Sequence, residues 1–412
     1  MKRIVVLGAG TGGTIVANRL RRVFAKDDVA ITCVDHDDRH LYQPGLLFVP
    51  FGLARPDEIV RSRRAQLAPG IDFLLDEVDH VDVAARAVHL ISGRDLTYDT
   101  LIVATGAVLA PEETEGLSGP GWMRNVFTFY SLDGASALGA KLATFERGRI
   151  VVNMIEMPIK CPVAPLEFCF LADWYFRERG LRGDVSISLV TPLDGAFTKP
   201  IATKHLDGML AERHIELVSG FNTGVVDAEA GALVSYDERR VPFDLAVIVP
   251  VHNGASYVAR SPGLGDALGF IDTDPVTLQS RVAPEIFVIG DAAAIPTSKA
   301  GSVAHFEGEV VVENVARFLS GQELDASFDG HSNCFIETGF SKAMLIDFNY
   351  DVEPETGHYP GVVGLPLLKE SRVNHVGKLL FQWLYWHVLL PGRDVPGIGS
   401  AMPTAGKHPE HV

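Results

Sequence analysis

The first 35 residues contain the pattern that most restricts how this chain can fold. A short run of apolar and β-branched residues, 3–8, predicts a strand. Three glycines with the spacing G-x-G-x-x-G follow it: Gly8, Gly10 and Gly13. A helical pattern comes next, and then a second strand, 29–34, which leads into Asp35, 22 positions beyond Gly13. This order predicts a dinucleotide-binding unit, with the pyrophosphate at the helix N-terminus and the carboxylate on a ribose.

Two later segments resemble the remaining nucleotide-binding signatures of flavoproteins that have two dinucleotide-binding domains. The strand 101–106 resembles their A-T-G strand end, with Thr105 and Gly106 as its last residues. Gly290-Asp291 resembles their second flavin signature, in which the aspartate contacts the ribityl chain. Three signatures in order favour FAD over NAD at this site. They predict an α/β fold of two Rossmann-like nucleotide-binding domains, arranged as in glutathione reductase.

The order of these segments predicts four regions. Residues 1–107 and 251–325 are the two parts of the FAD-binding domain, 108–250 a second Rossmann-like domain, and 326–412 a C-terminal region. The second domain has no glycine from Arg149 through Arg179, and the turn after its first expected strand contains three prolines. Without glycine the backbone cannot easily approach a pyrophosphate, and proline lacks an amide donor. This domain is therefore not expected to bind NAD(P)H in the usual way.

Charge and composition exclude several other functions. The 412-residue chain has a formal net charge of −16, which argues against a nucleic-acid partner because phosphate contacts need a clustered cationic surface. Four cysteines do not make a disulfide scaffold in a chain of this length. A strand begins almost at the N-terminus, so no signal peptide is expected. These features favour a cytoplasmic location, and no metal site is predicted.

The C-terminal region is predicted to contact a membrane surface. Its segment 379–390, LLFQWLYWHVLL, is apolar on nearly every side. Twelve residues are too few to cross a bilayer, but tryptophan and tyrosine favour the interface between lipid and water. We therefore expect an amphipathic region and a peripheral, monotopic association on the cytoplasmic face. A core helix or a dimer-interface helix is the alternative, and a homo-oligomer is left open.

The four cysteines differ in their local sequence. Cys33 lies inside an expected strand and Cys169 in an apolar helical stretch, so both are interpreted as buried structural residues. Cys161 lies at an expected strand-to-helix turn beside Lys160, where a cation and a helix N-terminus favour the thiolate. Cys161 is therefore a candidate functional thiol, with a structural role left open. Cys334, considered alone, is interpreted as structural.

Two longer motifs around the thiols resemble those of the sulfide:quinone oxidoreductase family. They are Lys160-Cys161-Pro162-Val163-Ala164-Pro165 and Cys334-Phe335-Ile336-Glu337-Thr338-Gly339. The segments 269–279, 295–301 and 378–381 are also similar to the family, so the resemblance covers nearly the whole chain in order.

This resemblance implies FAD as the cofactor, sulfide as the electron donor and a membrane quinone as the acceptor. It implies that Cys161 and Cys334 form a redox pair on one face of the flavin. Hydrosulfide attacks their disulfide or bridging sulfur, Cys161 passes two electrons on, and the product is polysulfide or zero-valent sulfur. Phe335 and Phe381 match residues that flank the quinone, with core packing as the alternative, and Lys378 matches a lysine near the flavin.

One departure distinguishes this chain from many family members. They carry a further cysteine before the first strand of the second domain, whereas residues 125–131 contain no thiol. A mechanism or product length that depends on a third cysteine is therefore not implied here. Two other functions stay open: a type-II NADH:quinone dehydrogenase, against which the glycine-free turn counts, and a non-catalytic, membrane-associated flavin-binding interaction protein. His305 and His331 are candidate proton carriers, with structural roles as the alternative.

Overall fold

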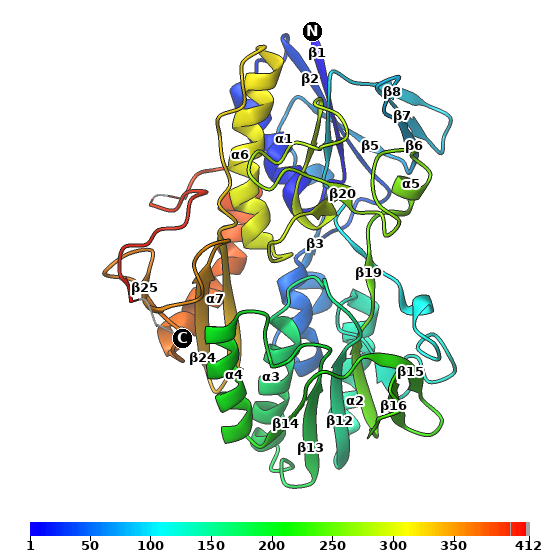
Figure 1. Ribbon diagram of the computed structural model, residues 1–412, viewed down its shortest axis with the longest axis vertical. Helices are drawn as coiled ribbons and strands as arrows, with labels where there is room; N and C mark the ends of the chain where they lie inside the picture. Colours follow the sequence, from blue (N-terminus) through cyan, green and yellow to red (C-terminus); the bar gives the residue numbers. More distant parts are fainter. Residues whose placement is uncertain (396, 409–412) are drawn as a thin grey trace.

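The computed structural model describes residues 1–395 and 397–408. The chain forms two units that are each built on a five-stranded parallel sheet, and a C-terminal region built on a third sheet. Figure 1 shows the first unit above the second, with the C-terminal region along one flank. The predicted α/β fold with two Rossmann-like units is confirmed. Residues 396 and 409–412 of the predicted C-terminal region lie outside the described residues.

The first unit contains the sheet β21-β9-β1-β2-β5, in which all neighbouring strands are parallel. Helices α1 and α6 pack against each other beside it (Figure 1). Every residue of β9 and β21 is buried, which explains why all of them except Thr100 are apolar. The main elements are β1 (Lys2–Leu7), α1 (Thr11–Val23), β2 (Val29–Asp35), β5 (Ile71–Leu75), β9 (Thr100–Val103), β21 (Ile286–Val288) and α6 (Gly301–Leu319).

Smaller elements surround this sheet. Three antiparallel strands form one side of the unit, β6 (Val78–Asp82), β7 (Ala87–Leu90) and β8 (Asp95–Thr97). The other short elements are β3 (His40–Leu41), β4 (Val60–Arg61), α5 (Ser256–Ala259), β20 (Ile271–Asp272) and β22 (Ala293–Ala294).

The second unit repeats the parallel arrangement with the strand order β11-β18-β12-β13-β14. A three-stranded antiparallel sheet, β15-β16-β17, is attached to it. Its elements are β11 (Val126–Phe127), α2 (Leu132–Thr144), β12 (Gly148–Met154), α3 (Ala164–Glu178), β13 (Val185–Val190), α4 (Pro200–Glu212), β14 (Ile215–Val218), β15 (Thr223–Asp227), β16 (Ala232–Ser235), β17 (Arg240–Pro242) and β18 (Leu245–Val249).

The chain passes between the two units twice, through one short antiparallel ribbon. β10 (Val108–Leu109) leaves the first unit and β19 (His252–Asn253) returns to it, and the two strands pair with each other. After this ribbon the chain supplies β21 and α6 to the unit that β1 began.

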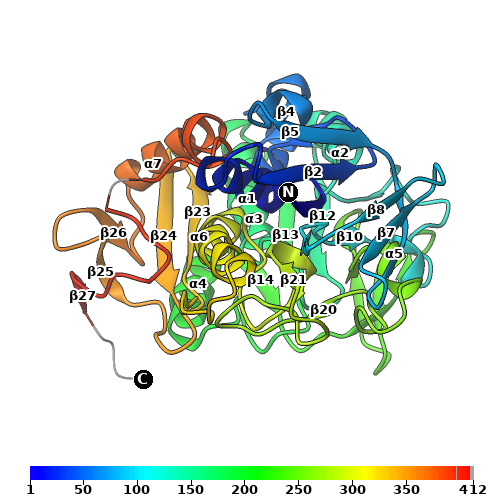
Figure 2. The ribbon, with the colours of Figure 1, turned by 90° about the horizontal axis from the view of Figure 1, so that it is seen from above.

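The C-terminal region is a mixed sheet covered by one helix. Its strand order is β23-β24-β26-β25-β27, and Figure 2 shows these elements, orange to red, on one flank of the molecule. β23 follows α6 closely in the chain and brings Cys334 and Phe335 to the other two units. The elements are β23 (Ser332–Gly339), β24 (Lys342–Phe348), β25 (Thr356–Tyr359), β26 (Leu365–Leu367), α7 (Arg372–Leu384), a single π-helical turn (Tyr385–Leu389) and β27 (Lys407–His408).

The segment 379–390 does not behave as one membrane-contacting unit. Its first half ends α7 and exposes Leu379, Leu380 and Trp383 by 53–57%. In its second half Tyr385, Trp386, Leu389 and Leu390 are buried, and the Tyr385 hydroxyl bonds to Thr11 Oγ1 at 2.7 Å and to His40 Nε2 at 2.6 Å. The expectation for the second half is therefore wrong, because the π-helical turn directs it into the core of the protein. Among the described residues, no helix has the length and apolar character needed to cross a bilayer.

Because the first half of the segment is exposed and the second half is buried, truncating a leucine in each half should lower the free energy of unfolding by different amounts. Leu390→Ala empties a fully buried site and should lower the free energy of unfolding by about 2–5 kcal/mol. Leu380→Ala, at a residue that is 57% exposed, should change it by about 0.5 kcal/mol or less. Urea denaturation followed by circular dichroism measures both, and equal costs would contradict the division.

Candidate active site

One cavity of about 550 Å³ lies where the three regions meet. The first unit contributes the glycine turn after β1 and the end of β9, the second contributes the turn before α3, and the C-terminal region contributes β23 and α7. The predicted site residues that line it are Gly8, Gly10, Asp35, Thr105, Gly106, Cys161, Gly290, Asp291, Cys334, Phe335, Lys378 and Phe381. Gly13 does not line the cavity. The structure therefore brings together residues that are more than 300 positions apart in the sequence.

The glycine turn has the shape that a dinucleotide needs. Gly8 has φ of +90°, and a Cβ there would lie 2.4 Å from the carbonyl oxygen of Ala104. A Cβ on Gly13 would lie 1.8 Å from the carbonyl oxygen of Gly8, so Gly13 allows the helix to pack closely on the strand. A Cβ on Gly10 would meet no atom within 4 Å, since this residue faces the open cavity. The N-terminus of α1 has no side-chain cap, so its amides remain available for a pyrophosphate.

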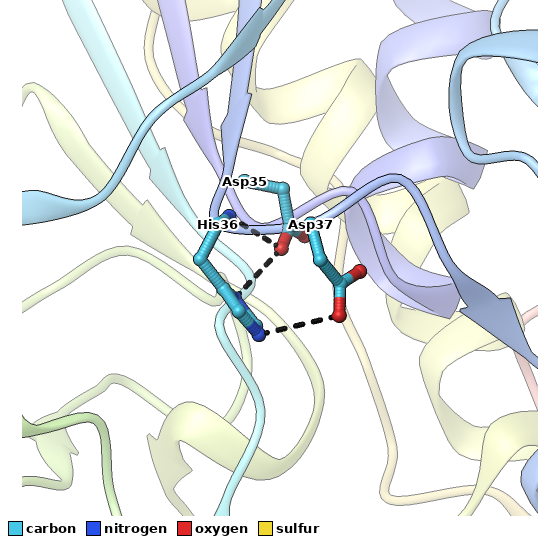
Figure 3. A group of neighbouring side chains, drawn as sticks. All are labelled: Asp35, His36 and Asp37. Atoms are coloured by element: carbon cyan, nitrogen blue, oxygen red, sulfur yellow. Dashed lines mark hydrogen bonds and ion pairs between the residues drawn. The ribbon is translucent and has the colours of Figure 1, made fainter.

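Asp35 lines the cavity at the end of β2. One of its carboxylate oxygens accepts a hydrogen bond from the backbone N–H of Ala9 at 2.7 Å, and Arg63 pairs with the same oxygen. Figure 3 shows Asp35, His36 and Asp37 together at the end of β2. The His36 ring lies 3.0 Å from Asp35 Oδ1 and 3.5 Å from Asp37 Oδ2, so these carboxylates already have partners within the protein.

The Gly290-Asp291 signature lies beside a buried acid and two lysines. The backbone N–H of Gly290 donates to Glu307 Oε2 at 2.6 Å, and burial raises the pKa of Glu307 to about 7. Burial also raises the pKa of Asp291, against the opposing charges of Lys299 and Lys160. Lys299 Nζ donates to the backbone oxygen of Asp291 at 2.7 Å. These contacts therefore hold the Gly290-Asp291 turn in place where it faces the cavity.

Cys161 has a strained backbone that three hydrogen bonds hold in place. Its φ is +47°, in the left-handed region that non-glycine residues rarely adopt. Its N–H donates to the carbonyl of Lys299 at 2.7 Å. Its own carbonyl accepts from the N–H of Ala164 at 2.9 Å and from the hydroxyl of Tyr130 at 3.2 Å. Such strain persists only where the surroundings impose it, and it is common at functional positions.

The two predicted thiols line the same cavity. Both are free and partly buried. Burial is the main reason that the pKa of each is raised, well above the usual value for Cys161 and to about 12 for Cys334. The charge of Glu167 adds to both shifts, Cys334 adds to that of Cys161, and Lys378 opposes both.

The expectation that Lys160 lowers the pKa of Cys161 is therefore wrong. Lys160 acts on Asp291, and the cation that favours the Cys161 thiolate is Lys378, on α7. The Ala164 amide at the start of α3 also lowers this pKa, as the expected helix N-terminus would, but burial outweighs both effects.

A buried ion pair between Glu167 and Lys378 lines the same cavity as the thiols. Lys378 pairs with Glu167 and donates to the carbonyl of Phe335 at 3.2 Å. Glu167 also accepts from the backbone N–H of Glu337 at 2.6 Å. Glu167 is 2% and Lys378 9% exposed. This pair ties α3 of the second unit to β23 and α7 of the C-terminal region.

The two predicted quinone-flanking rings lie at this end of the cavity. Phe335 and Phe381 both line it and are partly buried. Gly377 makes room for the Phe335 ring, because a Cβ there would lie 3.0 Å from its Cζ atom.

Other candidates lie outside the cavity. Cys33 and Cys169 are fully buried in apolar cores, as predicted from their sequence context. His331 is buried, pairs with Asp347 at 2.8 Å and stacks on Phe306. Burial lowers the pKa of His305 to about 4.

Four residues of the site were not recognised from the sequence: Arg63, Tyr130, Glu167 and Lys299. Glu167 is a charged residue inside an apolar stretch, which is a weak signal by itself, whereas Arg63 is one of three arginines in the segment 61–64 and does not stand out. Glu167 gave the strongest signal that could have been used, because it is the only acid in the apolar helix segment 163–172. Its partner Lys378 is 211 residues away, so the pair is visible only in the fold.

Comparison with known proteins agrees with this geometry. Residues 2–153 match the family model described as pyridine nucleotide-disulphide oxidoreductase. The mitochondrial sulfide:quinone oxidoreductase of Mus musculus is 27% identical over 397 residues, covering 94% of this chain and 86% of that protein. The crystal structure of the sulfide:quinone oxidoreductase from Aquifex aeolicus superposes with a TM-score of 0.81 at 20% identity, covering 95% of this chain and 92% of that chain. The alternative NAD(P)H-ubiquinone oxidoreductase C1 of Arabidopsis thaliana is 28% identical, covering 72% of this chain and 62% of that protein.

Fold, site and comparisons define the class of the protein. It is an α/β flavoprotein oxidoreductase with the pyridine nucleotide-disulphide oxidoreductase fold, and its cofactor is FAD. Within this class, relatives that match over nearly the full chain are sulfide:quinone oxidoreductases, which confirms the resemblance that the two cysteine motifs carry.

The two glycines predict separable effects on cofactor binding and on folding. Gly10→Ala adds a methyl group that the protein alone accommodates, so the variant should fold normally but retain little FAD. Gly13→Ala forces a Cβ onto the Gly8 carbonyl and should lower the free energy of unfolding by about 1–3 kcal/mol or more. Bound flavin, measured by absorbance after gel filtration, and denaturation of the apoprotein measure the two effects. Full FAD retention in Gly10→Ala would contradict the assignment of this glycine.

Proposed function

We propose that this protein oxidises sulfide to polysulfide or zero-valent sulfur and delivers the electrons to a membrane quinone, with Cys161 and Cys334 as the redox pair. The observation that supports this most is the meeting of these two thiols in one cavity. That cavity also holds the glycine turn, the Gly290-Asp291 turn and two aromatic rings. The relatives that match along nearly the whole chain are named for the same reaction.

The thiols would perform the sulfur chemistry by exchange. In the oxidised pair, hydrosulfide attacks one sulfur of the Cys161–Cys334 disulfide, so one S–S bond breaks and another forms. One cysteine then carries a persulfide and the other leaves as a thiolate, with no net change in oxidation state at this step. Lys378 is the cation that stabilises this thiolate against burial, and Glu167 holds Lys378 in place. FAD, when bound, supplies the two-electron acceptor between the thiol pair and the quinone.

The backbone around Cys161 would keep this thiol aimed at its partner. The hydrogen bond that the Cys161 N–H donates to Lys299 and the two that the Cys161 carbonyl accepts from Ala164 and Tyr130 leave the turn little freedom to relax. A nucleophile that is already oriented avoids the entropy cost of finding its attack geometry. Residues 125–131 contribute Tyr130 to this turn, at a place where many members of the family carry a cysteine.

The second unit gives no support to a nicotinamide donor. Between β12 and α3, where a glycine-rich turn would receive a pyrophosphate, the chain holds Cys161 against the carbonyl of Lys299. The type-II NADH dehydrogenase function is therefore the weaker candidate, and the match to the NAD(P)H-ubiquinone oxidoreductase covers less of the chain.

Helix α7 supports contact with a membrane surface, because its polarity is inverted. Its buried residues are Asn374 and Lys378. Its exposed large apolar residues form one stripe and are 51–57% exposed: Val373, Val376, Leu379, Leu380 and Trp383. A helix that turns apolar residues outward and polar residues inward fits lipid on its outer face. The same helix supplies Phe381 and Lys378 to the cavity. A lipid-soluble quinone would therefore enter the cavity next to the apolar stripe that contacts the membrane.

Replacing either proposed redox cysteine should remove the reaction and leave the cofactor in place. Cys161→Ser and Cys334→Ser should lower sulfide-dependent reduction of a soluble ubiquinone analogue by about three orders of magnitude or more, because neither variant can form the disulfide. Cys169→Ala is the matched control and should retain activity, since this thiol lies in the core away from the cavity.

The donor is checked in the same experiment. Anaerobic sulfide should bleach the flavin absorbance of the wild-type protein, and NADH should not. Bleaching by NADH alone would favour the dehydrogenase, bleaching by neither would favour a non-catalytic flavin-binding protein, and near-normal turnover in a cysteine variant would overturn the assigned roles.

Removing the apolar stripe should weaken membrane binding without affecting the fold. The double variant Leu380→Gln, Trp383→Gln should lower partitioning onto phospholipid vesicles by about tenfold or more, because burying a leucine contributes about 1.5–3 kcal/mol. Leu75→Gln, at a leucine that is 58% exposed on the first unit, is the control. Vesicle co-sedimentation measures the effect, and equal binding by all three proteins would contradict the proposed surface.

A further inference from the structure

A line of buried ionisable groups connects the aromatic end of the cavity with the protein surface. Lys378 lines the cavity and pairs with Glu167. Glu167 accepts a hydrogen bond from the backbone of Glu337, whose own carboxylate lies 2.9 Å from Nδ1 of His375. Glu337 is 2% exposed, whereas the His375 side chain is 22% exposed. The line therefore begins in the cavity and ends at a histidine that water can reach.

The proposed reaction needs such a connection. Oxidation of HS⁻ to zero-valent sulfur releases two electrons and one proton at the thiols. Reduction of a quinone to a quinol takes up two electrons and two protons. The balance is HS⁻ + quinone + H⁺ → S⁰ + quinol, so one proton from water must reach the quinone in each turnover.

We propose that His375 and Glu337 form the entry of a proton path that runs through Glu167 and Lys378 to the quinone held beside Phe335 and Phe381. Water protonates His375 at Nε2, and Nδ1 gives up its proton to the Glu337 carboxylate. The proton then passes to Glu167 and, through Lys378, to a quinone oxygen. This inference rests on the proposed function of the cavity and adds the route by which its second substrate is protonated.

The geometry of each step supports this order. His375 and Lys378 are three positions apart on α7 and therefore share one face, with about 5–6 Å between their Cβ atoms. Glu337 and Glu167 are direct neighbours, because the backbone N–H of Glu337 donates to Glu167 Oε1 at 2.6 Å. Burial is the main reason that the pKa of Glu167 is raised, and the charge of Lys378 opposes this shift.

The charged groups on the neighbouring elements already have partners or lie elsewhere. On the α4 side, Arg213 pairs with Glu370 and donates to the carbonyl of Thr338. In β24, Asp347 pairs with His331 and Lys407, and Lys342 is exposed. The charged group that bonds to His375 is Glu337. His375 does not line the cavity itself, but its ring bonds to the Glu337 carboxylate, one residue removed from Glu167 and Lys378 in the line.

Quinone-driven reoxidation tests the path without depending on the donor. FAD-loaded wild-type protein and variants are reduced anaerobically with dithionite and mixed with a soluble ubiquinone analogue, and the return of flavin absorbance is followed by stopped flow. His375→Ala and Glu337→Gln should slow this step by roughly 100-fold. Reduction by sulfide, which takes place at the thiols, should keep its wild-type rate in both. His358→Ala, at an exposed histidine of β25, is the matched control.

Added imidazole separates proton transfer from a structural role. It should restore the reoxidation rate of His375→Ala, because a small base can occupy the emptied, partly exposed position. A wild-type rate in His375→Ala, or a slow rate that imidazole does not restore, would overturn the path. This variant decides the question even if Glu337→Gln does not fold, because His375 is partly exposed. Failure of sulfide to reduce the wild-type protein would instead contradict the proposed function. Reoxidation after reduction with dithionite would still test the proton path.

Chemical labelling provides a readout that does not depend on turnover. Diethyl pyrocarbonate followed by peptide mass spectrometry should modify His375 in the folded protein and leave the fully buried His331 unmodified. Failure to label His375 would exclude it as the point of entry.

Discussion

The ion pair between Glu167 and Lys378 is the interaction on which the proposed chemistry depends most. Its two residues come from α3 and α7, and its hydrogen bonds reach the backbone of β23 at Phe335 and Glu337. A buried ion pair is costly to form, because each ion loses hydration worth several kcal/mol, and removing one partner leaves an unpaired buried charge. The pair therefore holds the C-terminal region against the second unit and, by the same contacts, sets the electrostatic field at both thiols.

The cavity combines rigid backbone with reactive side chains. Gly8 and Gly13 allow β1 and α1 to approach closely, and Gly10 leaves room in front of the helix N-terminus. Cys161 takes up a left-handed conformation that costs about 1–2 kcal/mol in an ordinary residue, and its hydrogen bonds offset that cost. Reactive positions are thus fixed by backbone contacts, which leaves the side chains free for chemistry.

The sequence predicted some parts of the site correctly and others wrongly, for one physical reason. The glycine turn, Asp35, the Thr105-Gly106 strand end and the Gly290-Asp291 turn are local patterns, because each depends on the backbone within a few residues. The environment of Cys161 is not local. The charge of its neighbour Lys160 acts on Asp291, and the cation that lowers the pKa of the thiol comes from α7.

The burial of residues in the segment 379–390 also depends on distant parts of the chain. Its composition is apolar throughout, so the sequence could not separate residues that face outward from residues in the core. The π-helical turn at Tyr385–Leu389 rotates the later side chains inward, where Tyr385 bonds to Thr11 and His40. A run of apolar residues indicates that their side chains avoid water, but it does not indicate whether protein or lipid covers them.

By itself, the sequence determined the α/β fold, the FAD-binding unit and the resemblance to sulfide:quinone oxidoreductases, because strand, turn and helix signals and short motifs are encoded by neighbouring residues. Only the tertiary structure decided that Glu167 meets Lys378, that Glu337 meets His375, and that the exposed stripe belongs to α7 alone. Charge pairing, burial and exposure depend on residues from distant parts of the chain, and these become neighbours only when the three sheets pack together.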